Sequence, residues 1–237
     1  MKQQRNAKHA CGHVLHTEPD LYMVVTYQPA DGAPNHCRAL CEFVDSAYPD
    51  HGDGLVVLLS PFDAYLTAAL ASKAGTLYHA IHASEFDPRE LIRDNGGVFH
   101  TFLHCAWGAH DGKLVTRRNG GLVSLYGLDT ATIPPDETDA IVLRVDAEDL
   151  AAYDRMREQA GLFAHSEAHA MFAVLDERGR HQAIARAMQR IPGTVDVSCE
   201  VNEMTIYDPE AAQWHFLPID VFHQSAEAVG QRGRDAA

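Results

Sequence analysis

Residues 55–59 read Leu-Val-Val-Leu-Leu, an apolar run of strand length with a helix start directly behind it. A run that is apolar on both faces is typical of a central strand in a sheet covered on two sides. Behind it, Ser60 suits an N-cap, Pro61 the first helical position and Asp63 the third position of a capping box. We therefore expect a strand to end near Leu59 and a helix to begin after Ser60.

The segment that follows has the spacing of an amphipathic helix. Its apolar side chains recur on one helix face, at Phe62, Tyr65, Leu66, Ala69 and Leu70. Gly75 suits the end of this helix, and residues 76–82, Thr-Leu-Tyr-His-Ala-Ile-His, are typical of a second strand. Strand, helix and strand together predict a βαβ unit, whose two strands we expect to be parallel if they share a sheet.

Turn residues divide the rest of the chain into strand-like and helix-like segments. A first strand is expected at 21–27. Three strands, at 98–107, 113–118 and 122–128, are predicted to form an antiparallel meander. The remaining segments are a strand at 140–145, helices at 147–160 and 182–190, and a closing hairpin at 195–207 and 214–217. Residues 37–44 and 162–175 fit either a helix or a strand. The predicted fold class is α+β, loosely α/β: a mixed β-sheet with one βαβ unit, an antiparallel meander and helices packed on the sheet.

The chain is expected to form one main folded unit. Its 237 residues are 46% hydrophobic, which is enough to bury a core without disulfide or metal staples. No internal repeat and no linker rich in Pro, Gly or Ser divides it. We expect a flexible His-rich arm at 1–18, a single α+β domain at 19–225 and a disordered tail at 226–237.

Charge and cysteine content restrict the partners and the compartment. The formal net charge of −14 produces a field that repels phosphate backbones, so general nucleic-acid binding is not expected. The basic start is not followed by an apolar run, and no apolar stretch is long enough to span a bilayer. Five cysteines, odd in number and sparse, indicate free thiols in a reducing compartment. These features predict a soluble, cytoplasmic protein without a membrane partner.

Soft metal ligands occur near the start of the chain. Cys11 and His13, together with Cys37 and Cys41, supply four ligands of the types that close a tetrahedral zinc site. The one-residue gap between Cys11 and His13 departs from the usual two-residue gap. The alternative interpretation is a flexible arm followed by two ordinary buried cysteines.

A second pair of possible metal ligands is His165 and His169. If this segment is helical, both imidazoles lie on one face, one turn apart, and can bind a single ion with a third ligand from elsewhere. The alternative is two histidines on the solvent side of a surface helix.

Histidines on two predicted strands are candidates for a general base. His79 and His100 are the catalytic candidates if one histidine of each strand meets the other across the sheet beside a carboxylate. The alternative is a set of core or sheet-surface histidines satisfied by hydrogen bonds. Ser60 and Asp63 lie at the carboxyl end of the first βαβ strand, where ligands bind in open sheets, so they are the cofactor-binding candidates.

The segment Leu77-Tyr78-His79, with a short helix and Gly96-Gly97 behind it, resembles the Leu-Tyr-His-Gly-Thr strand of ADP-ribosyltransferase-like domains. The resemblance implies that His79 holds the ribose of NAD. This chain departs from the pattern at Ala80 and Ile81, where the family has Gly and Thr.

Common catalytic signatures are absent: the sequence has no P-loop, G-x-G-x-x-G, G-x-S-x-G, H-E-x-x-H or C-x-x-C. The leading hypothesis is therefore a binding or regulatory protein that acts through another protein. One alternative is a zinc-dependent hydrolase built on His165 and His169. The other is an NAD-linked, ADP-ribosyltransferase-like enzyme around His79. No pattern indicates the oligomeric state.

Overall fold

The computed structural model describes residues 15–30, 33–44, 51–118, 120–134 and 141–223. The strands are β1 (Leu15–Glu18), β2 (Tyr22–Ala30), β3 (Ala33–Ala39), β4 (Cys41–Val44), β5 (Gly52–Leu58), β6 (Tyr78–His82), β7 (Val98–His110), β8 (Lys113–Thr116), β9 (Ser124–Thr132), β10 (Ile141–Arg144), β11 (Thr194–Asp196), β12 (Glu203–Asp208) and β13 (Gln213–Pro218). The helices are α1 (Pro61–Ala71), the 3-10 turn η1 (Ala83–Glu85), α2 (Arg89–Asp94), α3 (Ala147–Gln159), α4 (His165–Ala173) and α5 (Glu177–Gln189).

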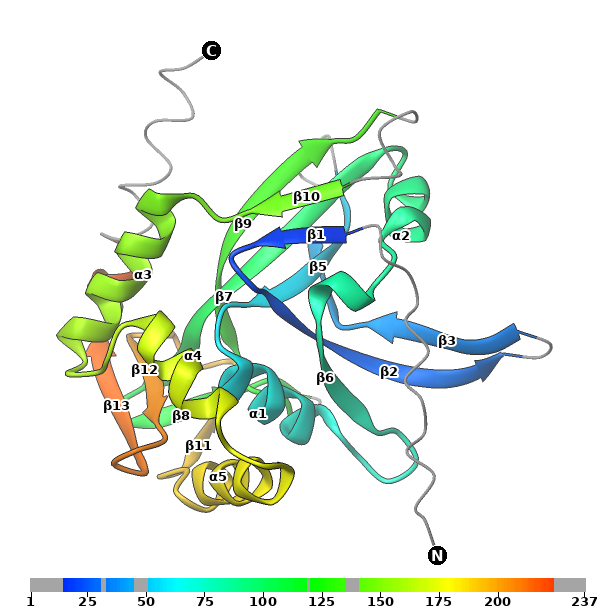
Figure 1. The fold of residues 1–237 in the computed structure, drawn as a ribbon. Coiled ribbons are helices and arrows are strands. Elements are labelled where there is room, and N and C mark those ends of the chain that lie inside the picture. Colours follow the sequence, from blue (N-terminus) through cyan, green and yellow to red (C-terminus); the bar gives the residue numbers. More distant parts are fainter. Residues whose placement is uncertain (1–14, 31–32, 45–50, 119, 135–140, 224–237) are drawn as a thin grey trace, which may run out of the picture.

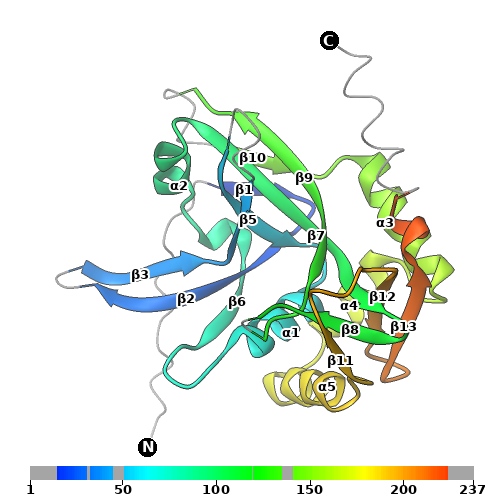
Figure 2. The same cartoon turned by 180° about the vertical axis from the view of Figure 1, so that it is seen from behind.

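The sheet is mixed and β7 is its longest strand. Eleven strands form one sheet, whereas β1 and β10 form a separate parallel pair. Strand β7 pairs with β5 in parallel and with β8, β9 and β12 antiparallel. In Figures 1 and 2 the hairpin of β2 and β3 projects from the body of this sheet. The α+β class, with helices packed on a mixed sheet, is confirmed.

The predicted βαβ unit is present as β5, α1 and β6. The Ser60 side chain accepts a hydrogen bond of 3.1 Å from the backbone N–H of Asp63, which is the predicted N-cap. Both β5 and β6 run antiparallel to β2, so they are parallel to each other with β2 between them. The local signals at Ser60 and the apolar stripe therefore correctly predicted this unit.

The meander differs in one detail from the sequence prediction. Strands β7 and β8 form the predicted hairpin, but β8 and the next segment are bridged only near the turn, at Thr116 and Leu122. From Ser124 onward, β9 pairs with β7 instead. Strand β8 has only four residues, and it also pairs in parallel with β11, a contact with no local sequence signal.

The two ambiguous segments are now assigned. Residues 37–44 are extended and belong to β3 and β4, which are separated only by Leu40. The Leu40 N–H donates to the Val24 carbonyl at 2.7 Å, and its carbonyl accepts from the Val56 N–H at 3.2 Å. Leu40 thus joins β2 to β5 where these strands diverge. In the other segment, 162–175, residues 165–173 form helix α4.

The last four residues of the expected N-terminal arm are part of the fold, which corrects the boundary at residue 18. Leu15 is fully buried in the main core cluster, and β1 pairs in parallel with β10. At the end of β1, Glu18 forms an ion pair of 2.9 Å with Arg144. Residues 1–14 of that arm and the expected tail at 226–237 lie outside the described residues.

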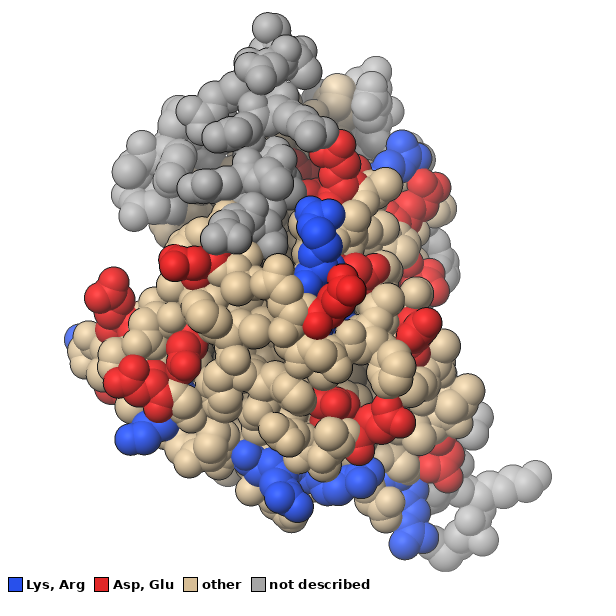
Figure 3. Space-filling model, turned by 90° about the vertical axis from the view of Figure 1, so that its left-hand side faces the viewer, with Lys and Arg blue, Asp and Glu red and all other residues tan. Residues whose placement is uncertain are grey.

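Apolar clusters cover both faces of the sheet. The largest cluster includes Leu55 and Val57 of β5 and extends to β1, β10 and α3, whereas Val56 and Leu58, on the opposite face, pack with Ala64 and Ala68 of α1. Figure 3 shows acidic side chains spread over one outer face, with basic side chains gathered along the lower edge at the level of α5. Over the described ranges, every helix is too short or too polar to cross a bilayer.

Candidate functional site

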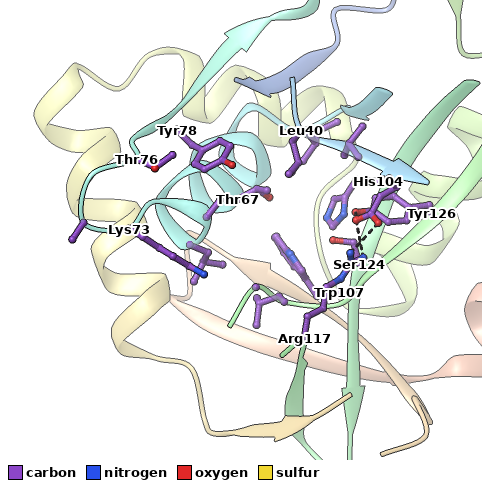
Figure 4. Close-up of a pocket in the computed structure, with 18 residues that line it drawn as sticks. Leu40, Thr67, Lys73, Thr76, Tyr78, His104, Trp107, Arg117, Ser124 and Tyr126 are labelled. Carbon is purple, nitrogen blue, oxygen red and sulfur yellow. Dashed lines mark hydrogen bonds and ion pairs between the residues drawn. The ribbon is translucent and has the colours of Figure 1, made fainter. Parts of the chain in front are cut away.

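A cavity of about 370 Å³ opens between helix α1 and the sheet. We call it the α1 cavity, and Figure 4 shows its lining. Its volume lies within the range of ordinary small-molecule sites, about 300–1,000 Å³. Its walls come from the second half of α1, the turn behind this helix, β5, β7, the β4 segment and the β8–β9 connection. Side chains distant in sequence therefore converge here because the mixed sheet brings these strands together.

Helix α1 contributes one of its faces to the cavity. Thr67, Leu70 and Ala71 are spaced by three and four residues, so they lie on the same side of the helix. Leu66 is fully buried, outside the lining. The Thr67 Oγ1 atom is buried and has no hydrogen-bond partner among the described residues. This face of α1 thus places a residue with a buried, unsatisfied hydroxyl in the cavity lining.

Strand β7 contributes His104 and Trp107, whose ring centroids are 4.8 Å apart. Residues three apart on a regular strand face opposite sides of the sheet. The register of β7 against β9 shifts between His104 and Ala106, which allows both rings to face the cavity. In Figure 4 the side chains of His104 and Thr67 approach the cavity from opposite sides.

His104 is an uncharged imidazole with an unsatisfied atom. Its residue is only 2% exposed, and burial lowers the pKa of His104 from 6.5 to about 3. Its Nε2 is buried and has no hydrogen-bond partner in the described part of the chain. At neutral pH this ring therefore adds hydrogen-bonding capacity to the cavity without adding charge.

A salt-bridge network forms the polar wall. Arg117 donates from Nη1 to Glu42 Oε2 at 2.9 Å, and its Nη2 lies 2.7 Å from Glu42 Oε1. The Tyr126 hydroxyl donates to the same Oε1 at 3.1 Å. Burial, and then the Glu42 charge, raise the pKa of Tyr126, so the phenol stays protonated as a donor. Arg117 is thereby held with its guanidinium plane fixed against one carboxylate.

The catalytic candidates from the sequence do not meet. His79 lies on β6, with its ring 5.3 Å from that of Tyr27, whereas His100 lies on β7 and is bonded through Nδ1 to Thr130 Oγ1 at 2.9 Å. Strands β2 and β5 lie between β6 and β7. His79 and His100 therefore do not meet across the sheet, because their strands are not neighbours. Neither histidine lines the α1 cavity.

The cofactor-binding candidates lie at the opposite end of α1 from the cavity. Ser60 caps the helix, and Asp63 is only 4% exposed. Burial raises the pKa of Asp63 to about 6, and the charge of Arg157 opposes that rise only in part. Ser60 and Asp63 therefore serve the helix start and the interior in this structure, and neither lines the cavity.

The helical metal candidates have different partners. His165 Nδ1 lies 2.9 Å from Asp154 Oδ1, and His169 Nε2 lies 3.2 Å from the Tyr22 hydroxyl. Although both histidines belong to α4, their imidazoles are held by separate neighbours. Throughout the described ranges, no group of three or more His, Cys, Asp or Glu side chains is placed to hold a metal ion.

The cysteine-based metal site is only partly covered by the structure. Cys11 and His13 lie outside the described residues. Cys37 is disulfide-bonded, which differs from the free thiol expected, whereas Cys41 is free. Burial raises the pKa of Cys41 to about 12, so its thiol is neutral near pH 7. Neither described cysteine is thus a thiolate in this structure.

Sequence reasoning missed most of the cavity. Ser124 and Tyr126 alternate along a predicted strand, which indicates a shared face, and His104 stands out as a buried-strand histidine. Glu42 and Arg117 are 75 positions apart and carried no signal of their pairing.

Comparison of the chain with protein-family models, with curated proteins and with solved structures found no match.

Proposed function

We propose that this protein binds a small organic molecule in the α1 cavity. The observation that carries the proposal is the pair of unsatisfied atoms, Thr67 Oγ1 and His104 Nε2, on residues that line one cavity. A buried polar group without a partner costs about 1–3 kcal/mol. Both atoms are buried, so a ligand that bonds to either one after a small rotation of the side chain recovers that free energy, which favours occupancy of this site.

The lining supports the same conclusion. Aliphatic side chains and the Trp107 ring cover part of the wall, while the Glu42–Arg117 pair and hydroxyl groups cover the rest. Apolar walls with a few convergent polar groups are typical of small-molecule sites. The salt bridge and the packed rings fix several of these side chains before any ligand arrives, which lowers the entropic cost of binding.

The other functional hypotheses stay predictions. A protein partner was expected from the acidic surface, and none of the described contacts identifies one. The hydrolase and transferase alternatives depend on His165, His169 and His79, which lie outside the α1 cavity. Small-molecule binding is preferred because it accounts for the two unsatisfied atoms on residues that line the α1 cavity, and the alternatives do not.

The test places a larger side chain on α1 so that it occupies the cavity. Ala71 lines the cavity, so Ala71→Phe places a ring in its volume without adding a tryptophan. Ala151, exposed on α3, provides the matched control Ala151→Phe. The probe is N-phenyl-1-naphthylamine, an uncharged dye whose fluorescence rises in apolar surroundings.

We expect saturable binding of one dye molecule to the unchanged protein and to Ala151→Phe. Binding to Ala71→Phe should be at least about tenfold weaker, which corresponds to 1.4 kcal/mol. Circular dichroism and thermal melts of the three proteins establish that each is folded. The proposal is wrong if the unchanged protein does not bind the dye, or if folded Ala71→Phe binds it equally well.

A further inference from the structure

We infer that the ligand of the α1 cavity is an uncharged aromatic molecule that carries a hydrogen-bonding group such as an amide or a hydroxyl. This inference rests on the proposed function and names the ligand class of the same site. Three features of the lining carry it: the compensation of its buried charges, the neutral character of its unsatisfied atoms and the rings in its wall.

The first feature is that the acidic and basic groups of the polar wall compensate each other. Glu42 accepts from Arg117 through both of its oxygens, and its Oε1 also accepts from Tyr126. The ion pair therefore has no net charge, and its carboxylate has little capacity left for a cationic ligand. An anionic ligand would compete with Glu42 for Arg117 and would leave that carboxylate without its counter-ion.

Lys73, the remaining charged residue of the lining, does not change this balance. It lies in the turn behind α1, is exposed and already interacts with another residue of the chain. Water and salt screen an exposed charge, so Lys73 does not direct an anion into the cavity. The net charge of −14 on the whole chain opposes an anion as well. An ion of either sign would therefore lose hydration in this cavity without gaining a counter-charge.

The second feature is that both unsatisfied atoms belong to neutral groups. The Thr67 hydroxyl donates and accepts, and burial lowers the pKa of His104 to about 3, so its imidazole is neutral near pH 7. His104 Nε2 donates or accepts according to the tautomer. In Figure 4 the two side chains approach the cavity from opposite sides. An amide or a hydroxyl donates and accepts without charge, so it can satisfy either atom after a small rotation of the side chain.

The third feature is the number of rings in the wall. Trp107, Tyr78 and Tyr126 line the cavity together with His104. The ring centroids of His104 and Trp107 are 4.8 Å apart and those of His104 and Tyr126 are 6.2 Å apart, so these three rings form one group. Aromatic rings contact one another in stacked or edge-to-face arrangements and bury large apolar areas. A rigid ring therefore suits this wall better than a flexible chain, which loses more entropy on binding.

The experiment compares competitors that share one indole ring and differ in charge. Near pH 7, indole-3-acetamide is uncharged, indole-3-acetate is an anion and tryptamine is a cation. Each is added to the unchanged protein with N-phenyl-1-naphthylamine bound. We expect indole-3-acetamide to displace the dye at a concentration at least about tenfold lower than either ion requires. Because the polar wall has no net charge, this order should be the same at low and at high salt.

A fourth competitor and two variants test the hydrogen bond. 3-Ethylindole keeps the ring and a short side chain but lacks the amide. Thr67→Val removes the hydroxyl and keeps the branched shape, and His104→Phe removes Nε2 and keeps a ring. The affinity of indole-3-acetamide relative to 3-ethylindole should fall about threefold or more in at least one of these variants. Thr132→Val, at an exposed position of β9 outside the cavity lining, should leave this ratio unchanged.

The outcomes separate the two proposals. If the unchanged protein does not bind the dye, the small-molecule function fails and the ligand class fails with it. If the dye binds, but either ion displaces it as readily as indole-3-acetamide or no competitor displaces it, the inference is overturned while the small-molecule function stands. A ratio of the two neutral competitors that is the same in all folded variants overturns the hydrogen-bonding part. The charge series uses the unchanged protein alone, so it remains decisive even if a variant does not fold.

Discussion

Replacement of His104 by phenylalanine should remove much of the destabilisation that acid causes in this protein. His104 is 2% exposed on β7, and its burial lowers the pKa from 6.5 to about 3. In the unfolded chain the imidazole is hydrated and takes up a proton below about pH 6.5. Phenylalanine keeps a ring beside Trp107 and does not titrate.

The sign and size of this effect on the free energy of unfolding follow from proton linkage. Between pH 6.5 and about pH 3 the unfolded state binds one more proton at His104 than the folded state does, so the free energy of unfolding falls as the pH falls. Each pH unit in this window is worth about 1.4 kcal/mol. Acidification from about pH 7.5 to about pH 4.5 should therefore cost the unchanged protein about 3 kcal/mol that His104→Phe retains. That is a large part of a typical stability of about 5–15 kcal/mol.

Urea denaturation followed by circular dichroism measures the effect at several values between pH 7.5 and 4.5. The relevant quantity is the difference in free energy of unfolding between the two proteins, because other titrating groups are common to both and cancel. His181→Phe, at an exposed position of α5, controls for the loss of an imidazole. A difference that stays constant over this range would refute the reasoning, because His104 would then titrate alike in both states.

The remaining predictions concern a buried carboxyl and a close approach of two strands. Burial raises the pKa of Asp63 from 3.8 to about 6, so the folded state holds this proton more tightly. Relative to Asp63→Asn, the free energy of unfolding should fall by about 3 kcal/mol as the pH rises from about 4 to above 6 in urea titrations; a difference that rises or stays flat contradicts this. A Cβ at Gly54 would lie 2.4 Å from the Phe102 ring, whereas one at Gly127 would meet nothing within 4 Å. In thermal melts, Gly54→Ala should lower the free energy of unfolding by about 1–3 kcal/mol and Gly127→Ala by less than about 0.5 kcal/mol. Equal melting temperatures of the two variants would contradict this, because β5 would then accommodate the added Cβ without strain.

The fold could be predicted where its causes are local. The cap at Ser60 and the apolar stripe of α1 lie within a dozen residues, so the βαβ unit follows from spacing alone. The pairing of β1 with β10 and the insertion of Leu40 between β2 and β5 depend on distant segments. No local pattern distinguishes such strands from a flexible arm or an irregular segment.

The same distinction holds for the α1 cavity. A histidine on an apolar strand is visible in the sequence, but its neutrality at His104 comes from burial by other elements. The shift in β7 register that turns Trp107 toward the cavity has no residue signature here. The pairing of Glu42 with Arg117 exists because β4 and the end of β8 reach the same wall. Residue types could therefore suggest a site, and only the assembled sheet shows its place.

The pairing of β7 with four other strands limits how the molecule can open. Because β7 is paired with β5, β8, β9 and β12, the amide hydrogens of its paired residues reach solvent only when the pairing on the edge that each of them faces breaks. Such amides exchange with deuterium only through openings close to global unfolding, whereas the outer part of the hairpin, where β2 pairs with β3 alone, can open without the rest of the sheet. The wall that carries His104 and Trp107 thus belongs to the slowest-exchanging part of the protein, and the shape of the cavity persists as long as the fold does.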